Sequence, residues 1–361
     1  SSDLWFKCDM VNSYLLRALS KPNSVSIDKL KGMPVELICK AHIPKVLFCL
    51  YTTAMITSAP RLAILTVAAL SSSLMSSTAF SNTFSQLSLS ASEEGNITRS
   101  LDSAGELNSQ IFRVEYTHGK LVQLNVDNSL TLSGLVSASK YDDFEGFDQL
   151  RWGGSLSYIH KSGFGPYAPK LGFDLSFSHS ELEGDARDNN LVTASFSYQK
   201  RISAAWLFNG GVEHQISRAD SLPADPNTLA LIYDDPSQRQ PGEIYDFEAT
   251  TLFTTLEYAF ENGVLLSADY RYTDGVIIST TKHPTLHLYK ISEAVYSDSA
   301  FSEGWYAYQI EANTSAWSLG ASLPTGTDSS INISYSLYNI DGSEHSNYEN
   351  DIVAVSFVHN F

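Results

Sequence analysis

Six of the nine histidines lie near serine or acidic residues and are the side chains best suited to acid-base chemistry. An imidazole gains and loses a proton near neutral pH, so a histidine beside a hydroxyl or a carboxylate is a candidate for hydrolytic catalysis. Serine is abundant in this chain, and a catalytic triad is defined by its geometry in space, so proximity along the sequence does not identify one. The candidates are His160, His179, His214, His283, His287 and His345.

Metal binding has two candidate sources, a histidine pair and two acidic segments. His283 and His287 would suit a metal only on a helix, and Pro284 between them disfavours a helix. Clustered carboxylates suit Ca²⁺ or Mg²⁺, but the acidic segments match no defined calcium loop. We therefore expect a solvated acidic surface, with no metal and no cofactor. The carboxylates are Glu181, Glu183, Asp185 and Asp188 in one segment and Asp234, Asp235 and Glu243 in the other.

The charge of the chain is unevenly distributed. Residues 1–79 hold 8 Lys and Arg and 4 Asp and Glu, which gives them a net charge of +4. The whole chain has a net charge of −17, so the remaining residues carry −21. Such an acidic body lacks the clustered Lys and Arg that neutralise phosphates, which argues against nucleic acid as a partner. Cys8, Cys39 and Cys49 all precede residue 55, so we expect no disulfide framework after it.

Residues 55–79 have the three parts of a secretory signal peptide. Arg61 supplies the positive flank, Leu62 to Leu70 the apolar core, and Ser77-Thr78-Ala79 a small-residue exit, which predicts cleavage after Ala79. The alternative is a buried helix in an N-terminal domain.

Residues 1–54 lie upstream of this signal. The chain opens with Ser1, whereas Met55 heads a complete signal. We therefore expect residues 1–54 to be a spurious extension of the reading frame or disordered. A genuine cytoplasmic extension is the alternative.

After residue 80, apolar and polar residues alternate with a period of two up to the end of the chain. In "PKLGFDLSFSHS", Leu171, Phe173, Leu175 and Phe177 share one face, and Gly, Asp and Ser occupy the other. A soluble sandwich would need apolar inner faces on both of its sheets, so this division favours a wall with lipid on one side and water on the other. Short joins also alternate with long polar ones, as periplasmic turns alternate with outer loops in membrane barrels.

These features predict an all-β fold, a transmembrane antiparallel up-and-down β-barrel of 10 to 12 strands over residues 110–361. An even number is expected in bacterial barrels, and twelve is favoured. Residues 80–109 are expected to be partly extended, and residues 110–126 to form a hairpin. The ten strands expected after this hairpin are 129–139, 149–160, 168–180, 189–200, 202–217, 247–260, 263–275, 305–323, 329–340 and 350–361.

The apolar face changes parity inside one expected strand. Tyr308 and Ile310 fall on the opposite parity to Trp317 and Leu319. We expect either a bulge near residues 313–316 or a first part of this strand that rises above the membrane.

Charged side chains of both signs fall on the face opposite to the apolar one. In a channel they would create a transverse field that sets solute preference, whereas in a closed barrel they would pair and plug the lumen. Asp269 and Arg271 lie two apart on one strand, so each is expected to find a partner on a neighbouring strand. The lumen-facing candidates are Arg151, Asp174, Glu213, Glu257, Asp269 and Arg271.

The last residues, "NDIVAVSFVHNF", resemble the C-terminal assembly signal of outer-membrane barrels, in which the final strand ends in Phe and is read by the insertion machinery. His359 departs from the aromatic or aliphatic residue that is usual at its position. The residues that carry the resemblance are Val353, Val355, Phe357 and Phe361.

The stretches "LTLSGLVSASKYDDFEGFDQLRWGGSLSYIH", "LLSADYRYTDG" and "NYENDIVAVSFVHNF" resemble a group of proteobacterial outer-membrane barrels with no assigned activity, over roughly residues 110–361. A fainter likeness is to the translocator barrels of autotransporters, although no passenger domain fits between residues 80 and 110. The resemblance implies a bacterial outer-membrane location. It also implies outer-membrane lipid, lipopolysaccharide and the barrel assembly machinery as partners, and leaves the oligomeric state open.

The expected function is a porin-like channel for small solutes or an envelope structural protein, and not an enzyme. The alternative is an outer-membrane hydrolase. It would need a histidine within hydrogen-bond reach of a serine or an acidic partner at the rim of the barrel.

Overall fold

The computed structural model describes residues 83–100, 105–220, 244–282, 288, 292, 294–298, 300–301, 303–342 and 346–361. The expectations for residues 1–54 and 55–79 lie outside this part of the chain. Two short 3₁₀ helices, Glu145–Phe147 and Asp185–Arg187, lie in connections between strands. None of the helices described has the length and apolar character needed to cross a membrane. The strands are β1 (Thr83–Glu94), β2 (Ser109–Gln123), β3 (Asn128–Tyr141), β4 (Gln149–Lys161), β5 (Lys170–Leu182), β6 (Asn189–Arg201), β7 (Trp206–Ala219), β8 (Phe247–Ala259), β9 (Leu265–Thr281), β10 (Ala294–Ser297), β11 (Tyr306–Pro324), β12 (Ser329–Gly342) and β13 (Ser346–Asn360).

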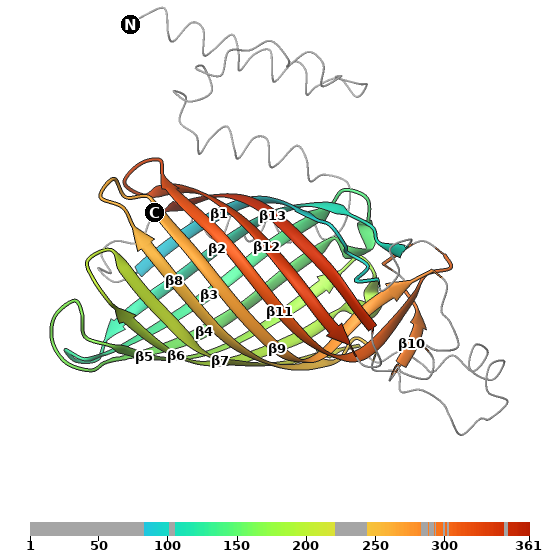
Figure 1. The fold of residues 1–361 in the computed structure, drawn as a ribbon, viewed down its shortest axis with the longest axis horizontal. Coiled ribbons are helices and arrows are strands. Elements are labelled where there is room, and N and C mark those ends of the chain that lie inside the picture. The colour runs from blue at the N-terminus through green and yellow to red at the C-terminus, as the bar shows by residue number, and fades with distance from the viewer. Residues whose placement is uncertain are drawn as a thin grey trace, which may run out of the picture. The chain divides into compact units, whose positions relative to one another are not determined.

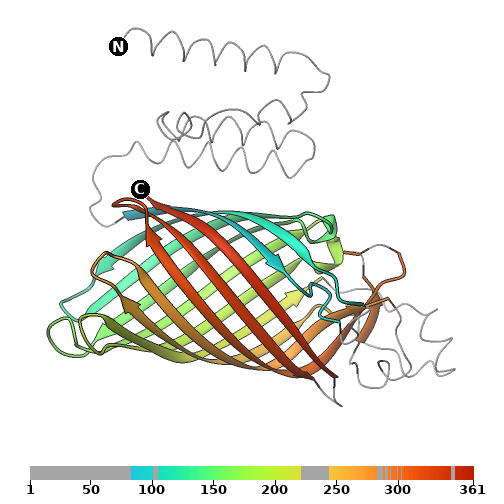
Figure 2. The same ribbon diagram turned by 45° about the horizontal axis from the view of Figure 1, so that its top comes forward.

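Twelve of the described strands form one closed antiparallel ring (Figures 1 and 2). Each strand from β1 to β8 pairs with the next one in the sequence, and β11 pairs with both β9 and β12. β12 pairs with β13, which returns to pair with β1. The short strand β10 lies outside the ring and pairs with the first residues of β11. The prediction of an up-and-down barrel is confirmed, and the strand number is twelve.

The first strand of the ring corrects the hairpin expected at residues 110–126. β2 runs through this region as a single strand, and its antiparallel partner is β1. The barrel therefore begins at Thr83 rather than at residue 110.

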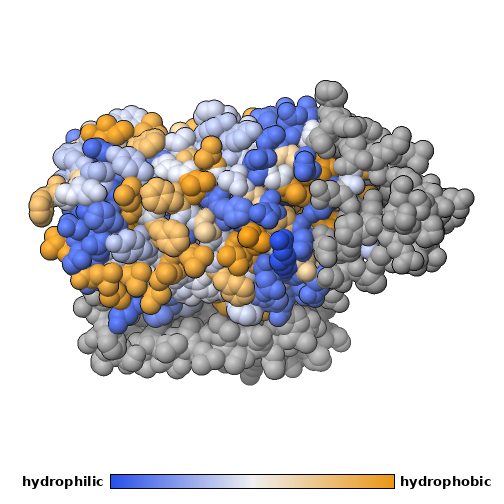
Figure 3. Space-filling view, turned by 90° about the horizontal axis from the view of Figure 1, so that it is seen from below, coloured by the Kyte–Doolittle hydropathy of each residue, from blue (hydrophilic) through white to orange (hydrophobic). Residues whose placement is uncertain are grey.

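The outward face of the wall is apolar. In the strand register Phe173 lies opposite Phe196, Phe196 opposite Val212, and Val212 opposite Leu252. All four side chains are exposed. Figure 3 shows hydrophobic residues (orange) over much of the wall, with hydrophilic residues (blue) most concentrated beside one end. An outward face with this many exposed apolar side chains matches the lipid-facing band of a membrane barrel.

The inward face is polar and consists mostly of small side chains. One row across the register joins Asp174, Ser195, Glu213, Thr251 and Thr273 on successive strands. Each of these residues follows or precedes an outward apolar residue, because side chains alternate along a strand. The period-two pattern of the sequence is thus the pattern of the wall.

The two ends of the barrel differ in their connections. Turns of four or five residues join β2 to β3, β6 to β7, β8 to β9 and β11 to β12 at one end. The connections at the other end include the two longest, between β7 and β8 and between β9 and β11. In Figure 1 the short-turn end is on the left and the long-loop end, with β10, is on the right.

β11 has no bulge. Its register with β9 and with β12 is unbroken through residues 313–316, so the expected bulge is wrong. The parity change has another cause. Tyr308 and Ile310 face inward near the long-loop end, where they are only 1% and 0% exposed and pack against other parts of the protein.

Candidate functional site

The six charged residues expected on the inner face are spread over five strands. Each neighbours an outward apolar residue on its own strand, as Arg151 neighbours the exposed Trp152. The register therefore places all six toward the lumen. They are Arg151 on β4, Asp174 on β5, Glu213 on β7, Glu257 on β8, and Asp269 and Arg271 on β9.

Arg271 and Glu213 form an ion pair inside the lumen. Arg271 Nη2 donates to Glu213 Oε1 at 2.9 Å, although β8 lies between their strands. The side chain of Arg271 is nevertheless 46% exposed. Because an inward-facing side chain with this exposed fraction contacts water, the described side chains do not fill the lumen at this level.

Two inner carboxylates accept hydrogen bonds from the neighbouring strand. Thr255 Oγ1 donates to Asp269 Oδ1 at 2.6 Å, and Ser195 Oγ donates to Asp174 Oδ2 at 3.2 Å. Asp269 thus has its partner on the adjacent strand, whereas the partner of Arg271 is one strand further away.

A second group of inward charges lies nearer the long-loop end, and only one of its members was predicted from the sequence. Arg151 and Glu115 lie on opposite sides of Ser137 in the register. Arg113 lies opposite Ser139, and its Nε donates to the Ser139 hydroxyl at 2.9 Å. Two arginines and one carboxylate therefore surround this part of β3.

The long-loop end carries a group of packed loops that we call the cap. It comprises the described residues of 95–108, 142–148, 183–188, 244–246 and 294–305. Its apolar centre is buried and consists of Ile97, Ala300, Phe301 and Trp305, with Leu107, Tyr141, Phe144 and Phe147 packed against them.

Aromatic rings make the main contacts of this centre. The Phe301 ring lies 5.2 Å from the Phe144 ring and 5.2 Å from the Phe147 ring, and it stacks on Trp305 at 5.3 Å. Gly146 also approaches Ala300 closely, since a Cβ on Gly146 would stand 2.3 Å from the Ala300 Cα. Aromatic contacts of this kind contribute on the order of 1 kcal/mol each beyond the area they bury.

These contacts cross the barrel mouth. Phe301 precedes β11 and Phe147 follows β3, and in the ring these two strands are separated by β12, β13, β1 and β2. Strands so far apart in a twelve-membered ring stand on nearly opposite walls. Their loops can meet only over the opening, so the cap covers at least part of the mouth.

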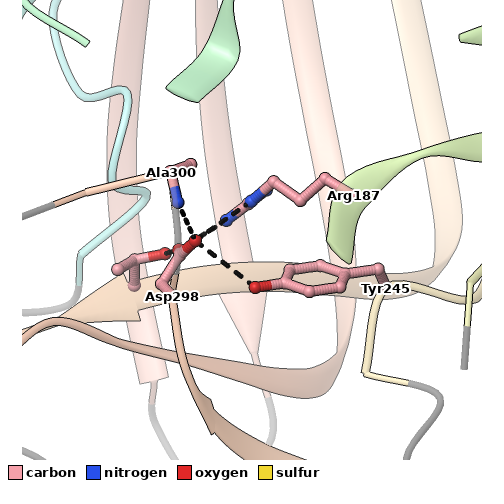
Figure 4. A network of polar contacts seen from close by, with 5 residues as sticks. Arg187, Tyr245, Asp298 and Ala300 are labelled. Carbon is pink, nitrogen blue, oxygen red and sulfur yellow. Dashed lines mark hydrogen bonds and ion pairs between the residues drawn. The ribbon is translucent and has the colours of Figure 1, made fainter. Parts of the chain in front are cut away.

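Asp298 is the centre of a polar network in the cap (Figure 4). Its side chain is 0% exposed and accepts hydrogen bonds from Arg187 Nε at 3.1 Å and Arg187 Nη2 at 2.5 Å. It also accepts from Thr280 Oγ1 at 2.7 Å, Tyr245 OH at 3.3 Å and the Ala300 N–H at 3.1 Å. β9 and three different loops are joined at this carboxylate.

The Arg187 guanidinium lies between two aromatic rings. Its Cζ is 4.7 Å from the Phe147 centroid and 4.6 Å from the Tyr245 centroid, within the range of cation–π attraction. Burial by itself would lower the pKa of Arg187, but the adjacent Asp298 carboxylate favours the charged form, and the pKa is raised. Burial also raises the pKa of Tyr245, with Arg187 opposing and Asp298 reinforcing the shift. Arg187 therefore stays charged and Tyr245 stays neutral at physiological pH.

One candidate histidine has both a hydroxyl and a carboxylate beside it. His214 Nδ1 lies 3.0 Å from Thr250 Oγ1, and His214 Nε2 lies 3.3 Å from Glu248 Oε1. All three residues lie on the outward face of β7 and β8. His160 and His179 instead contact asparagine side chains at 2.8 and 3.0 Å. The remaining candidates, His283, His287 and His345, lie outside the described residues.

Two further histidines contact serine at the short-turn end. His118 Nδ1 lies 2.8 Å from Ser85 Oγ, and His359 Nδ1 lies 2.8 Å from Ser329 Oγ. These pairs could not be predicted from the sequence, because each is formed by residues about thirty positions apart on neighbouring strands.

The first acidic segment contributes to loop structure. Asp188 Oδ1 accepts a hydrogen bond from the Leu182 N–H at 2.6 Å and so closes the loop between β5 and β6. Within the part of the chain that the structure describes, no three His, Cys, Asp or Glu side chains are grouped to hold a metal ion. Asp234, Asp235 and Glu243 lie outside that part.

Three of the residues that resemble an assembly signal lie in β13, the strand that closes the ring, and Phe361 directly follows it. Phe357 lies opposite Leu89 and Val355 opposite Ala91 of β1. Val353, Val355 and Phe361 are exposed on the outward face. They are therefore accessible from the side of the barrel that lipid or another protein would contact.

Comparisons with known proteins give solved structures that are outer-membrane barrels. No protein-family model and no curated protein matches the chain. An outer-membrane channel from Pseudomonas putida F1 is 12% identical in sequence, and its TM-score is 0.47. The aligned region covers 79% of this chain and 97% of the channel. The translocator domain of the autotransporter NalP from Neisseria meningitidis has 11% identity, coverage of 86% and 98%, and a TM-score of 0.39. The KdgM porin in complex with disordered oligogalacturonate has 8% identity, coverage of 76% and 99%, and a TM-score of 0.37.

Proposed function

We propose that the protein is a bacterial outer-membrane channel that passes small solutes through its lumen, with the cap narrowing the long-loop end. The observation that carries this proposal is the contrast between the two faces of one wall. Leu319 is 65% exposed on the outward face, where water would be unfavourable, and Arg271 is 46% exposed on the inward face, where water is required.

Membrane insertion follows from the same contrast. A wall whose outer side chains are apolar and whose backbone groups are paired around a closed ring is stable in a bilayer, because no strand edge is left unpaired. The short-turn end would face the periplasm and the long-loop end the lipopolysaccharide. The outward residues of β13, together with Phe361 that follows it, would be the part read by the barrel assembly machinery.

The cap makes the channel selective for size. Loops from opposite walls meet over the opening, so a solute has to pass beside them or wait until they separate. The Arg187–Asp298 pair would then limit how often the mouth is fully open.

The proposal is tested by liposome swelling with the purified, refolded barrel. We expect uncharged sugars up to a sharp size limit to enter, and larger ones to be excluded. Weakening the cap with Asp298→Asn should raise the size limit. Liposomes that contain folded protein but do not swell with the smallest sugar would favour an envelope structural role.

The contacts of His214 support a second candidate, hydrolysis of a lipid ester at the outer surface. The His214 imidazole lies between the Thr250 hydroxyl and the Glu248 carboxylate and contacts both, as the roles of nucleophile, base and orienting group require. This candidate requires ester hydrolysis in detergent that is lost in His214→Asn and Thr250→Val. Equal background rates in wild type and both variants would remove it.

A further inference from the structure

We propose that Arg113 and Arg151 form a binding site for the oxyanion group, a carboxylate or a phosphate, of a small solute inside the lumen below the cap. This inference rests on the proposed channel function and adds the class of solute that the lumen recognises.

Arg151 is half-buried, and its guanidinium lacks hydrogen-bond partners in the part of the chain that the structure describes. Its Nε is buried and has no hydrogen-bond partner among the described residues. The ion pairs of that part of the chain all involve other residues. A guanidinium has only donors, and a buried donor without an acceptor is unfavourable. The two terminal nitrogens of Arg151 likewise make no ion pair within the described residues, and an anion in the lumen would supply acceptors to them.

Arg113 lies beside Arg151 with donors to spare. Its Nε is used by Ser139, which leaves the two terminal nitrogens for a ligand, and the side chain is exposed in the lumen. The two arginines lie on opposite sides of β3, against Ser137 and Ser139. Both serines are small and buried, so they leave room for the longer side chains of their neighbours.

Two other arginines, one in the lumen and one in the cap, are already compensated. Arg271 pairs with Glu213 at 2.9 Å and Arg187 pairs with Asp298. Because a paired guanidinium has little attraction left for a solute, an anion that enters the lumen should bind at Arg113 and Arg151. The planar fork of each guanidinium matches the paired oxygens of a carboxylate or phosphate.

Glu115 opposes such an anion. It shares Ser137 with Arg151 in the register but is in no ion pair of the described chain. Its charge repels a bound anion and lowers the affinity of the site, which suits a channel because a solute that binds too tightly cannot leave.

The test is isothermal titration calorimetry of the folded barrel in detergent with succinate, inorganic phosphate and, as an uncharged control, glucose. We expect succinate and phosphate to bind and glucose not to bind. Arg151→Gln and Arg113→Gln should each lower the anion affinity about tenfold or more, as expected for loss of a charge-assisted bidentate contact. Glu115→Gln should raise it severalfold.

The matched control is Arg271→Gln, which removes the same charge from a lumen arginine that is already paired. It should change the affinity less than about twofold, because a paired arginine contributes little to ligand binding. An equal loss of anion affinity in Arg271→Gln would show that anions respond to the overall charge of the lumen and not to a site at Arg113 and Arg151. Loss of binding in Glu115→Gln, or no anion binding in the wild type, would also overturn the inference.

Folding of each variant is checked by the change in gel mobility on heating, so a misfolded variant is recognised. Failure of this inference is distinct from failure of the proposed function. A barrel that swells liposomes but binds neither anion overturns only the oxyanion site. A barrel that binds the anions but passes no solute overturns only the channel.

Discussion

Arg187 and Asp298 lie 111 residues apart in the sequence and form a two-hydrogen-bond ion pair in which the aspartate side chain has no exposed surface. The pair ties the loop after β5 to the loop before β11. Because both groups are desolvated, each requires the other: removal of one leaves a buried charge without compensation. This pair is therefore the most sensitive point of the cap.

Asp298→Asn should destabilise the cap by about 3 to 5 kcal/mol while the barrel wall stays folded. Limited proteolysis should then cleave the long-loop end faster, with the heat-dependent gel shift unchanged. The exposed pair of Lys140 and Asp148 provides the control, since Lys140→Gln should cost at most about 1 kcal/mol. Equal proteolysis of wild type and Asp298→Asn would contradict a structural role for the pair.

Alkaline pH should open the cap through Tyr245. Burial raises the pKa of this phenol above its ordinary value of 10.0, so the folded cap binds the proton more tightly than the open one. The stabilisation is complete below pH 10 and declines as the pH rises above it. Proteolysis of the cap should accelerate above about pH 10 in the wild type and much less in Tyr245→Phe. The same pH profile in both proteins would rule out this cause.

Leu319 tests the orientation of the wall. Leu319→Lys places a charge on the lipid-facing side and should destabilise the barrel in vesicles by about 2 to 4 kcal/mol if Leu319 lies near the middle of the bilayer. The adjacent Ser318→Lys points into the lumen and should cost much less. Denaturant unfolding in vesicles measures both changes. The reverse order would mean that the two faces have been assigned the wrong way round.

Phe361 should matter for assembly more than for final stability. Its ring is exposed and contacts His359 at 4.5 Å, so its removal loses little packing. Phe361→Ala should slow the appearance of the folded gel species in membranes that contain the assembly machinery. Spontaneous folding into detergent should be nearly unchanged. Equal slowing in both settings would indicate a packing defect instead of lost recognition.

Much of the fold could be predicted from the sequence because the two faces of a membrane barrel require apolar and polar residues to alternate along each strand. Lipid outside and water inside impose strict alternation, so strands such as β5 and β12 are readable from single residues. β1 was missed because the apolar side of its central segment has only Leu87, Leu89 and Ala91. The turn-like sequence around Gly119 then split β2 into two arms, although Gly119 lies within the continuous strand.

Near the cap, the alternation of apolar and polar residues no longer predicts which side chains face outward. Tyr308 and Ile310 face inward and are buried by the cap, so their apolar character follows protein packing instead of lipid contact. Arg113 and Glu115 alternate with Phe112 and Val114 in the sequence. They were not predicted to face the lumen, because this segment was expected to form a hairpin. The network around Asp298 had no local signal, because its members come from separate loops that only the closed ring brings together.

Single-channel recording in planar bilayers tests the central claim most directly, because a water-filled lumen conducts ions and a plugged one does not. We predict stepwise currents for the wild-type barrel and longer or larger openings for Asp298→Asn. Complete silence of both proteins, with folded barrels demonstrably inserted in the bilayer, would contradict the account.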